Sequence, residues 1–177
     1  MAAKNALELL STLTNRIMQL TTYRVELKWA FVFIGMTLLW LVLEMILGFH
    51  DQYIEYHPIV SNLIAVPAIL IYVFALLDKR KSFYEGKLTY KQGLVTGIII
   101  SLIITLFVPI TQSIISLVIT PDYFDNAIKY SIESGNATRE EATSYFNLKS
   151  YIIQGVIFTP VIGIITTLIV AIFVKRS

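Results

Sequence analysis

One short stretch of this sequence collects most of the side chains that could do chemistry. It reads EMILGFHDQYIEYHPIVSN, from Glu44 to Asn62, and joins the end of one apolar run to the start of the next. A carboxylate inside an apolar run is a candidate functional group by default, because a charge in lipid costs free energy. His50, Asp51 and His57 lie between the two runs. The stretch therefore predicts either a polar binding site or the polar connection of a membrane hairpin.

The later apolar runs each carry one amide near the same end. Counted inward from that end, Asn62 lies about four residues deep, Gln154 about three and Gln112 about seven, so all fall within roughly 10 Å at helical rise. Three prolines share one depth below them, and the hydrogen bonds they remove would allow kinks that open a pocket centred on Glu44. The prolines are Pro67, Pro109 and Pro160, and the candidate binding residues are Glu44, Asn62, Gln112, Gln154, His50, Asp51 and His57.

A structural interpretation of these residues stays open. Glu44 is close enough to the membrane interface to reach polar headgroups or to bond Asn62, and prolines are tolerated in membrane helices. The connection holds metal-ligating side chains but lacks the helical histidine spacing of zinc sites, so we expect no metal and no cofactor. These side chains are His50, Asp51, Glu55 and His57.

Nothing in the sequence specifies catalysis. His50 and Asp51 have no exposed nucleophile specified beside them, and the chain lacks a glycine-rich phosphate loop or a dinucleotide fingerprint. It also contains no cysteine, which excludes thiolate nucleophiles and disulfides. We therefore predict no catalytic residue and no enzymatic activity.

Membrane-spanning helices are the elements that must position these groups. The 177 residues are 56% hydrophobic with a mean hydropathy of +0.71, which is more apolar than an ordinary soluble domain. Crossing the hydrocarbon core takes about 20 helical residues, and four stretches are long enough. These are residues 29–48, 58–77, 93–119 and 151–174. The sequence predicts an all-α polytopic protein with four transmembrane helices in a lipid bilayer.

The basic residues predict how these spans are oriented. Most Lys and Arg residues lie before the first span, between the second and third, or at the C-terminus, whereas the other two connections hold only Lys129, Arg139 and Lys149. By the positive-inside rule both termini are predicted to be cytoplasmic, which places the protein in a bacterial inner membrane. The net charge is only +2 and forms no basic face, so nucleic acid is not an expected partner.

The segment before the first span has a helical pattern of its own. Leu10, Leu13, Ile17 and Leu20 recur at steps of three and four, which is typical of one stripe of an amphipathic helix. We predict a cytoplasmic amphipathic segment over residues 1–27 and a four-helix transmembrane domain over residues 28–177. The stripe would rest on the inner leaflet or bind the helix of a partner protein.

Small residues predict which spans pack together. They recur at every fourth position in the third and fourth spans, and such ladders let helix backbones approach closely in lipid. We expect these two spans to pack against each other, and homodimerisation through either ladder is the alternative. The ladders are Gly93, Gly97, Ser101, Thr105, Pro109 and Ser113, and Gly155, Thr159, Gly163, Thr167 and Ala171.

The connection between the third and fourth spans contains helix signals. Pro121 is typical of a helix start, the sequence SGN ends that helix, and Thr138 with Glu141 forms a capping box for another. These signals predict a short extracytoplasmic helical hairpin.

Four stretches of the chain carry a family resemblance. They are VELKWAFVF, LGFHDQYIEYHPIVSNLIAVPAILIYVFALLDKRKSFYEGKLTYKQG, ITPDYFDNAIKYSIESG and YFNLKSYIIQ. From about Val25 onward the chain resembles a family of small four-span bacterial membrane proteins, DUF family 4199, frequent in Bacteroidota and defined as a domain of unknown function. The resemblance implies an inner-membrane protein with the topology above. It implies no activity and no catalytic residue.

The sequence is compatible with two functions. The first is a non-enzymatic accessory or scaffold subunit that binds a membrane-protein partner or a second copy of itself. The alternative is a small permease, channel or sensor with an outward-facing polar pocket centred on Glu44. The inner half of the bundle is expected to hold hydroxyl groups but no charge, which counts against a proton-coupled transporter.

Overall fold

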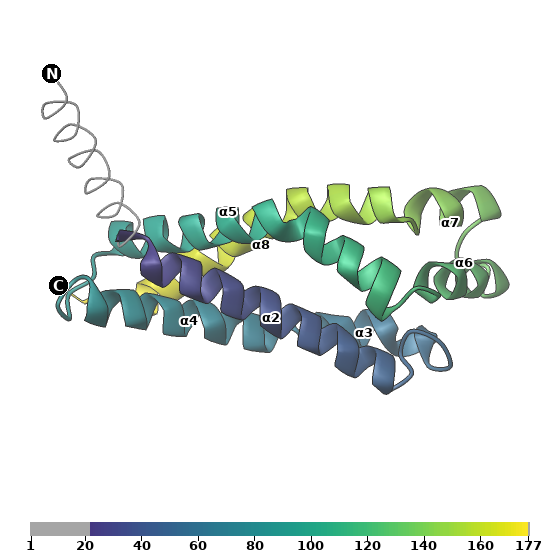
Figure 1. The fold of residues 1–177 in the computed structure, drawn as a ribbon, viewed down its shortest axis with the longest axis horizontal. Helices are drawn as coiled ribbons and strands as arrows, with labels where there is room; N and C mark the ends of the chain where they lie inside the picture. Colours follow the sequence, from purple (N-terminus) through teal and green to yellow (C-terminus); the bar gives the residue numbers. More distant parts are fainter. Residues whose placement is uncertain (1–21, 177) are drawn as a thin grey trace, which may run out of the picture.

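The computed structural model describes residues 22–176, and all regular structure in that range is helical apart from one isolated antiparallel bridge between Leu88 and Arg176 (Figure 1). The predicted stripe of the N-terminal segment lies outside the described residues. The helices are α2 (Arg24–Ile46), the 3₁₀ helix η1 (Ile54–Tyr56), α3 (His57–Asn62), α4 (Ala65–Ser82), α5 (Tyr90–Ile114), the π-helix η2 (Ile115–Ile119), α6 (Tyr123–Glu133), α7 (Arg139–Tyr145) and α8 (Leu148–Val174).

The all-α architecture with four candidate spans is confirmed. Within the described residues, four helical segments are long and apolar enough to cross a membrane, as in a multi-pass membrane protein. Large apolar side chains on their outer surfaces are exposed, including Leu39, Leu106 and Phe173. Extensive exposed apolar surface of this kind suits contact with lipid. The four segments are Arg24–Ile46, Ile54–Ser82, Tyr90–Ile119 and Leu148–Val174.

The second segment is broken into two helices, α3 and α4, rather than kinked. Pro67 has no backbone N–H and cannot bond the carbonyl of Leu63 as a helix requires. That carbonyl instead accepts from the amide of Val66 at 3.1 Å, in a tighter turn. The backbone of Leu63 and Ile64 stays in the right-handed helical region, so α3, which carries His57 and Ser61, continues from the same candidate span as α4.

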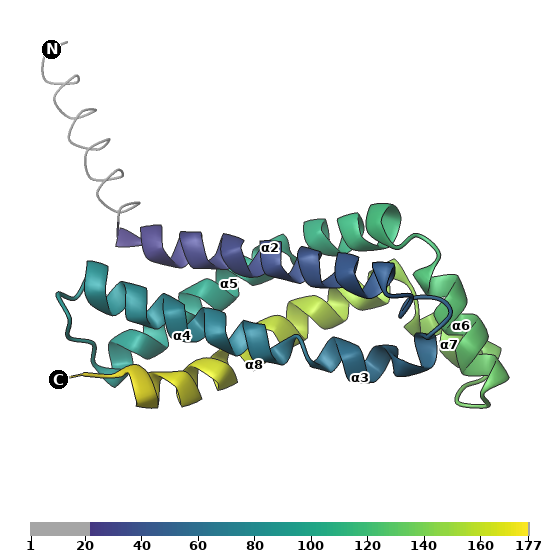
Figure 2. The same ribbon diagram turned by 90° about the horizontal axis from the view of Figure 1, so that it is seen from below.

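The predicted packing of the third and fourth spans is also confirmed, because α5 and α8 make the most extensive helix contact in the described fold. Both views of the ribbon show these helices crossing (Figures 1 and 2). At the crossing, a Cβ added to Gly97 would lie 2.2 Å from Oγ1 of Thr167, and one added to Gly163 would lie 2.1 Å from Oγ of Ser101. Only glycine permits this approach.

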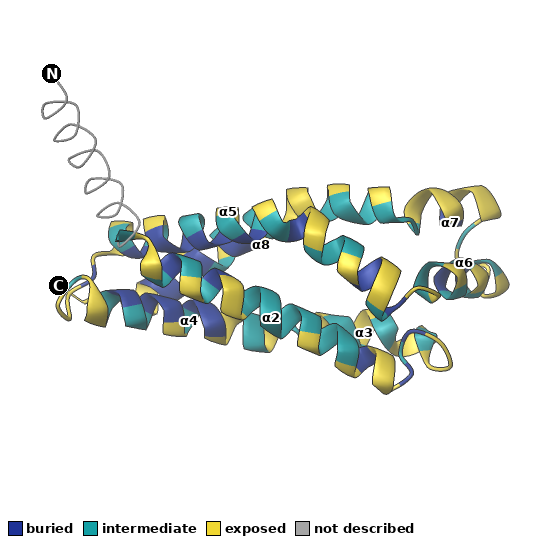
Figure 3. Cartoon of the chain, in the orientation of Figure 1, coloured by how far each residue is buried: buried dark blue, intermediate teal, exposed yellow. Residues whose placement is uncertain are grey.

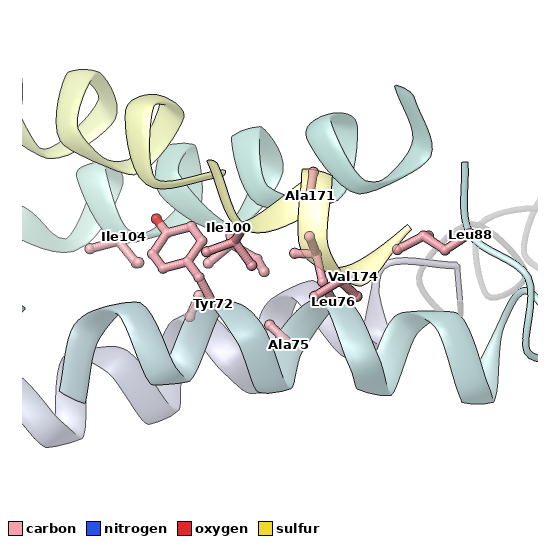
Figure 4. Close-up of a cluster of buried hydrophobic side chains, with 10 residues drawn as sticks. Tyr72, Ala75, Leu76, Leu88, Ile100, Ile104, Ala171 and Val174 are labelled. Atoms are coloured by element: carbon pink, nitrogen blue, oxygen red, sulfur yellow. The ribbon is translucent and has the colours of Figure 1, made fainter. Parts of the chain in front are cut away.

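The buried core fills the half of the bundle where α4, α5 and α8 converge (Figure 3). Figure 4 shows how its side chains interdigitate between these three helices and the segment that precedes α5. Packed apolar side chains fill this half of the bundle. Its labelled members are Tyr72, Ala75, Leu76, Leu88, Ile100, Ile104, Ala171 and Val174.

The expectation that this half carries no charge is wrong. Glu26 and Lys79 are both buried there and form an ion pair of 2.8 Å between α2 and α4. Lys79 also donates to the carbonyl of Thr22 at 2.7 Å. Sequence reading placed both residues outside the spans, but α2 starts at Arg24 and α4 continues to Ser82.

The two helices predicted between the third and fourth spans are present as α6 and α7. α6 starts at Tyr123, two residues after Pro121, and Gly135 adopts a φ of +71° in the turn that separates the helices. The capping box of Thr138 and Glu141 forms as predicted. Both helices lie with α3 at the end of the bundle opposite the C-terminus (Figure 2).

Candidate functional site

The candidate site lies where α2 ends and α3 begins. Glu44 occupies the last turn of α2, and its side chain is 1% exposed although it carries a carboxylate. Gly48, with a φ of +78°, allows the tight turn that follows the helix. This turn brings His50 back over Glu44. His57 is the first residue of α3, and its side chain also approaches Glu44. Three residues separated in sequence thus converge on one point.

The Glu44 carboxylate is surrounded by polar groups. Oγ of Ser61 lies 2.9 Å from each carboxylate oxygen and donates to them, and Nε1 of Trp40 donates to Oε1. The Nε2 atoms of His50 and His57 lie 3.2 Å and 3.6 Å from Oε2. Partners from its own helix, the connection and α3 therefore compensate the desolvation of this carboxylate.

Two tyrosines extend the cluster toward α8. The Tyr123 hydroxyl lies 3.4 Å from Nδ1 of His57 and 3.2 Å from the Tyr151 hydroxyl. Its ring packs against both histidine rings, with centroid separations of 5.2 Å and 4.9 Å. Burial raises the pKa of Tyr123, so its hydroxyl stays protonated at neutral pH and can act as both donor and acceptor.

A cavity of about 110 Å³ adjoins the cluster. Its wall contains both histidines, and further hydroxyl and amide groups come from α5, η2, α6 and α8. A second hollow of about 130 Å³ shares His50, Thr120 and Tyr123 with the cavity and is also lined by the exposed Asp51 and Asp122. The polar members of the cavity wall are His50, His57, Ser61, Gln112, Ser116, Thr120, Tyr123 and Tyr151.

The structure brings together only some of the candidate binding residues that the sequence predicts. Glu44, His50 and His57 meet directly, and Gln112 lines the cavity, where its amide donates to Ser116 at 2.9 Å. Asn62 does not bond Glu44, because its side chain is exposed and donates to the Pro58 carbonyl at 2.7 Å.

Two further predicted residues lie apart from the cluster. Gln154 donates to Oγ of Ser150 at 3.0 Å, within its own helix. Asp51 is exposed, and its carboxylate accepts from the amide of Gln52, while its side chain lines only the neighbouring hollow. A shared depth in the membrane did not suffice to bring side chains on different helix faces together.

Sequence reading missed three members of the site. Tyr123, Tyr151 and Trp40 are not among the candidate binding residues that the sequence predicts. Trp40 precedes Glu44 by four positions, which places the two side chains on one helix face. That spacing was a usable signal. The tyrosines gave none, because their contact depends on how α6 and α8 pack.

The side chains of this cluster can offer a ligand a negative charge and nitrogen lone pairs. Glu44 contributes a full negative charge, and the imidazoles contribute nitrogen lone pairs when neutral. The three side chains can each point one ligand atom to a common position, since these atoms lie within 4.8 Å of one another. Such a set suits a small cation or a solute rich in hydrogen-bond donors.

Comparison with known proteins returns one family. The family described as "Protein of unknown function (DUF4199)" matches residues 28–176. No curated protein matches the chain, and no solved structure does.

Proposed function

The chain belongs to the DUF4199 family of proteins of unknown function, and we propose that it binds a small cation in the pocket centred on Glu44. The proposed location is a bacterial inner membrane, with both termini cytoplasmic and the pocket facing outward. In this proposal the protein is a ligand-binding sensor rather than an enzyme.

The single observation that supports this proposal is the burial of Glu44 beside a cavity. A carboxylate with no function near the interface would extend toward polar headgroups, as charged side chains at helix ends commonly do. Glu44 is instead 1% exposed and held by side chains that also line a cavity of about 110 Å³. An occupant of this cavity would contact His50, His57 and Ser61, which contact the carboxylate in turn, so the negative charge of Glu44 favours a cation there.

The opposite half of the bundle favours a sensor over a channel or permease. There α5 and α8 approach through glycines, and the apolar cluster fills the space between them and α4. A conducting protein ordinarily lines its path with polar or ionisable groups. The buried ion pair of Glu26 and Lys79 in this half joins α2 to α4.

The test is a ligand-dependent shift in thermal stability. The protein in lipid nanodiscs is melted in the presence of alkali cations, divalent cations, ammonium or methylated amines. A cation at 100 times its Kd stabilises the folded state by about 2.7 kcal/mol, which is a shift of several degrees in Tm. We expect such a shift for the wild type, no shift for Glu44→Gln, and a full shift for Glu55→Gln, which alters an exposed carboxylate nearby.

The two variants make the result interpretable. Failure of every cation to stabilise the wild type, or an equal shift in Glu44→Gln, would contradict the proposed pocket. Circular dichroism of Glu44→Gln at low temperature establishes whether the helices have formed, so that loss of binding is separated from loss of fold.

A second candidate is an accessory subunit that binds a partner protein, and one observation favours it. Helix α7 and the segments beside it border an open hollow of about 800 Å³ outside the spans, lined in part by Tyr145 and Phe146. Tyr145 is 51% exposed there, and exposed aromatic residues are enriched at protein interfaces. Crosslinking in the native membrane followed by affinity purification tests this role. A stoichiometric partner that is lost in Tyr145→Ser would support it.

A further inference from the structure

We propose that the cation bound in this pocket is a zinc-type divalent transition metal ion, held by Glu44, His50 and His57. This inference rests on the proposed function and specifies its ligand class. It departs from the expectation of no metal, which considered only residues of the connection and did not include Glu44.

The spacing of the ligand atoms fits a tetrahedral ion. Zinc binds imidazole nitrogen and carboxylate oxygen at about 2.0 to 2.2 Å, so two ligands of one tetrahedral ion lie about 3.3 Å apart. Oε2 of Glu44 lies 3.2 Å from Nε2 of His50 and 3.6 Å from Nε2 of His57. Side-chain adjustments would let one ion contact all three atoms, and the Ser61 hydroxyl must turn away to admit it, because its Oγ lies 2.9 Å from Oε2 of Glu44 and 3.1 Å from Nε2 of His57.

The surroundings supply, for His57, the supporting contact that a metal-bound histidine needs. A ligating histidine donates its second ring N–H to an oxygen, which fixes the tautomer and the ring orientation. Nδ1 of His57 lies 3.4 Å from the Tyr123 hydroxyl, and that hydroxyl lies 3.2 Å from the hydroxyl of Tyr151. If Nδ1 of His57 donates to Tyr123, its Nε2 presents a lone pair toward Glu44.

His50 gives an independent reason to expect an additional ligand. Its side chain is 8% exposed, and its Nδ1 has no hydrogen-bond partner among the residues that the structure describes. An imidazole buried to this degree normally uses both nitrogens, because an unmatched polar atom is costly in an apolar setting. The ring borders both hollows, and a water or other polar ligand held in one of them would supply the partner that Nδ1 lacks.

The two hollows also provide a fourth ligand and an entry path. The cavity of about 110 Å³ borders both histidines and has room for a water molecule, which needs about 30 Å³. The neighbouring hollow reaches exposed Asp51 and Asp122, whose charges raise the local concentration of cations at the entrance. Three protein ligands with an open fourth position form an exchangeable site, as sensing requires.

The experiment measures zinc binding by the full chain in lipid nanodiscs, purified through a tag that contains no histidine. Competition with a fluorescent zinc chelator gives Kd, and elemental analysis gives the number of ions per chain. We expect one ion per chain in the wild type. Loss of a supporting contact typically weakens metal affinity by about 10 to 100-fold, so Tyr123→Phe should fall in that range, and Glu44→Gln and His57→Ala should lose at least about 100-fold.

Matched controls separate this site from the simpler alternative in the connection. Glu55→Gln removes an exposed carboxylate of the connection that lines neither hollow, and it should change the zinc affinity less than threefold. Substitution with Co²⁺ in the wild type should give the intense visible absorption of a four-coordinate nitrogen and oxygen site, and Glu44→Gln should lose it.

Each outcome decides the inference. Zinc that does not bind the wild type, or that binds Glu44→Gln equally well, overturns it. Equal losses in Glu55→Gln and Glu44→Gln overturn the assignment of Glu44 as a ligand. If zinc does not bind but an organic cation stabilises the wild type and not Glu44→Gln, the metal assignment fails while the pocket stands. If no cation stabilises the wild type, both proposals fail.

Discussion

Among residues 22–176, the buried carboxylates are Glu26 and Glu44, and each has a different kind of partner. Glu26 is matched by the ammonium group of Lys79, which also lies 4.1 Å from the centre of the Phe83 ring. Glu44 is matched by a hydroxyl, an indole and two imidazoles. A fixed countercharge stabilises structure and leaves no demand for a ligand. Neutral donors can release the carboxylate to an ion, so the second arrangement is suited to binding.

The buried ion pair of Glu26 and Lys79 should stabilise the fold more than the exposed pair of Lys28 and Asp78. Lys79→Met leaves Glu26 buried without a countercharge, and the expected loss in the free energy of unfolding is about 3 to 5 kcal/mol. Adding Glu26→Gln should recover most of that loss. Chemical unfolding in detergent, followed by circular dichroism, gives the values.

Lys28 provides the control for this prediction. It also pairs with an acid on α4, Asp78, at 2.8 Å, but its side chain is 57% exposed. Exposed pairs contribute about 0 to 1 kcal/mol, so Lys28→Met should have a small effect. Equal losses for the two lysine variants would mean that burial of the Lys79 pair is not what stabilises the bundle.

At the scale of elements, the small-residue ladders act within one chain. The residues that would contact Cβ atoms at Gly97 and Gly163 belong to α8, α5 and α4 of the same molecule. Sequence reading left open whether the ladders join two spans or two copies. In the described fold the ladders join two spans of one chain, α5 and α8, which the connection between them already holds near each other.

Gly97→Ala tests this role of the ladder. The new Cβ would lie 2.2 Å from Oγ1 of Thr167, and overpacking of this kind costs about 1 to 3 kcal/mol. Adding Thr167→Gly should restore stability, because it removes the atoms that clash. Gly35→Ala is the matched control, since no atom lies within 4 Å of its new Cβ. A change in oligomeric state without loss of stability would instead assign the ladder to a dimer.

The capping box of α7 should make that helix sensitive to acid. The backbone N–H of Thr138, and then its hydroxyl, donate to Glu141 and hold its pKa below the ordinary value of 4.5. Because the folded pKa is the lower one, the cap stabilises α7 above the ordinary value and is lost as pH falls through the folded value. Amide hydrogen exchange, corrected for its intrinsic pH dependence, should therefore accelerate in α7 on acidification.

Two comparisons check this assignment. Glu141→Gln keeps a capping side chain but cannot titrate, so the acceleration should disappear. Helix α6 has no side-chain cap at its start and should show no corresponding change. An unaltered pH profile in Glu141→Gln would assign the effect to another group.

At the scale of the whole molecule, sequence reading recovered what local patterns determine. The four spans, the helices α6 and α7, the capping box and the contact of α5 with α8 follow from composition, caps and small-residue spacing. The interruption before Pro67 follows from the missing N–H of proline. The convergence of His50 and His57 on Glu44 does not follow from a local pattern, because it depends on how α2, α3 and α6 meet in space. Asn62 illustrates the difference, since it shares the depth of Glu44 but points away from it.

The orientation in the membrane can be tested cleanly because the chain contains no cysteine. Single cysteines are introduced at Asn136, between α6 and α7, and at Glu85, between α4 and α5. Both positions are exposed. Since basic residues before α5 favour the cytoplasm, a membrane-impermeant maleimide should label Asn136→Cys in intact spheroplasts and Glu85→Cys only after permeabilisation.

Leu106→Cys is the control for embedding, because Leu106 is 76% exposed in the protein yet should stay unlabelled where lipid covers it. Labelling of Leu106→Cys would mean that α5 lies outside the hydrocarbon core. The reverse pattern at the other two positions would place the Glu44 pocket on the cytoplasmic side, where its occupant would come from inside the cell.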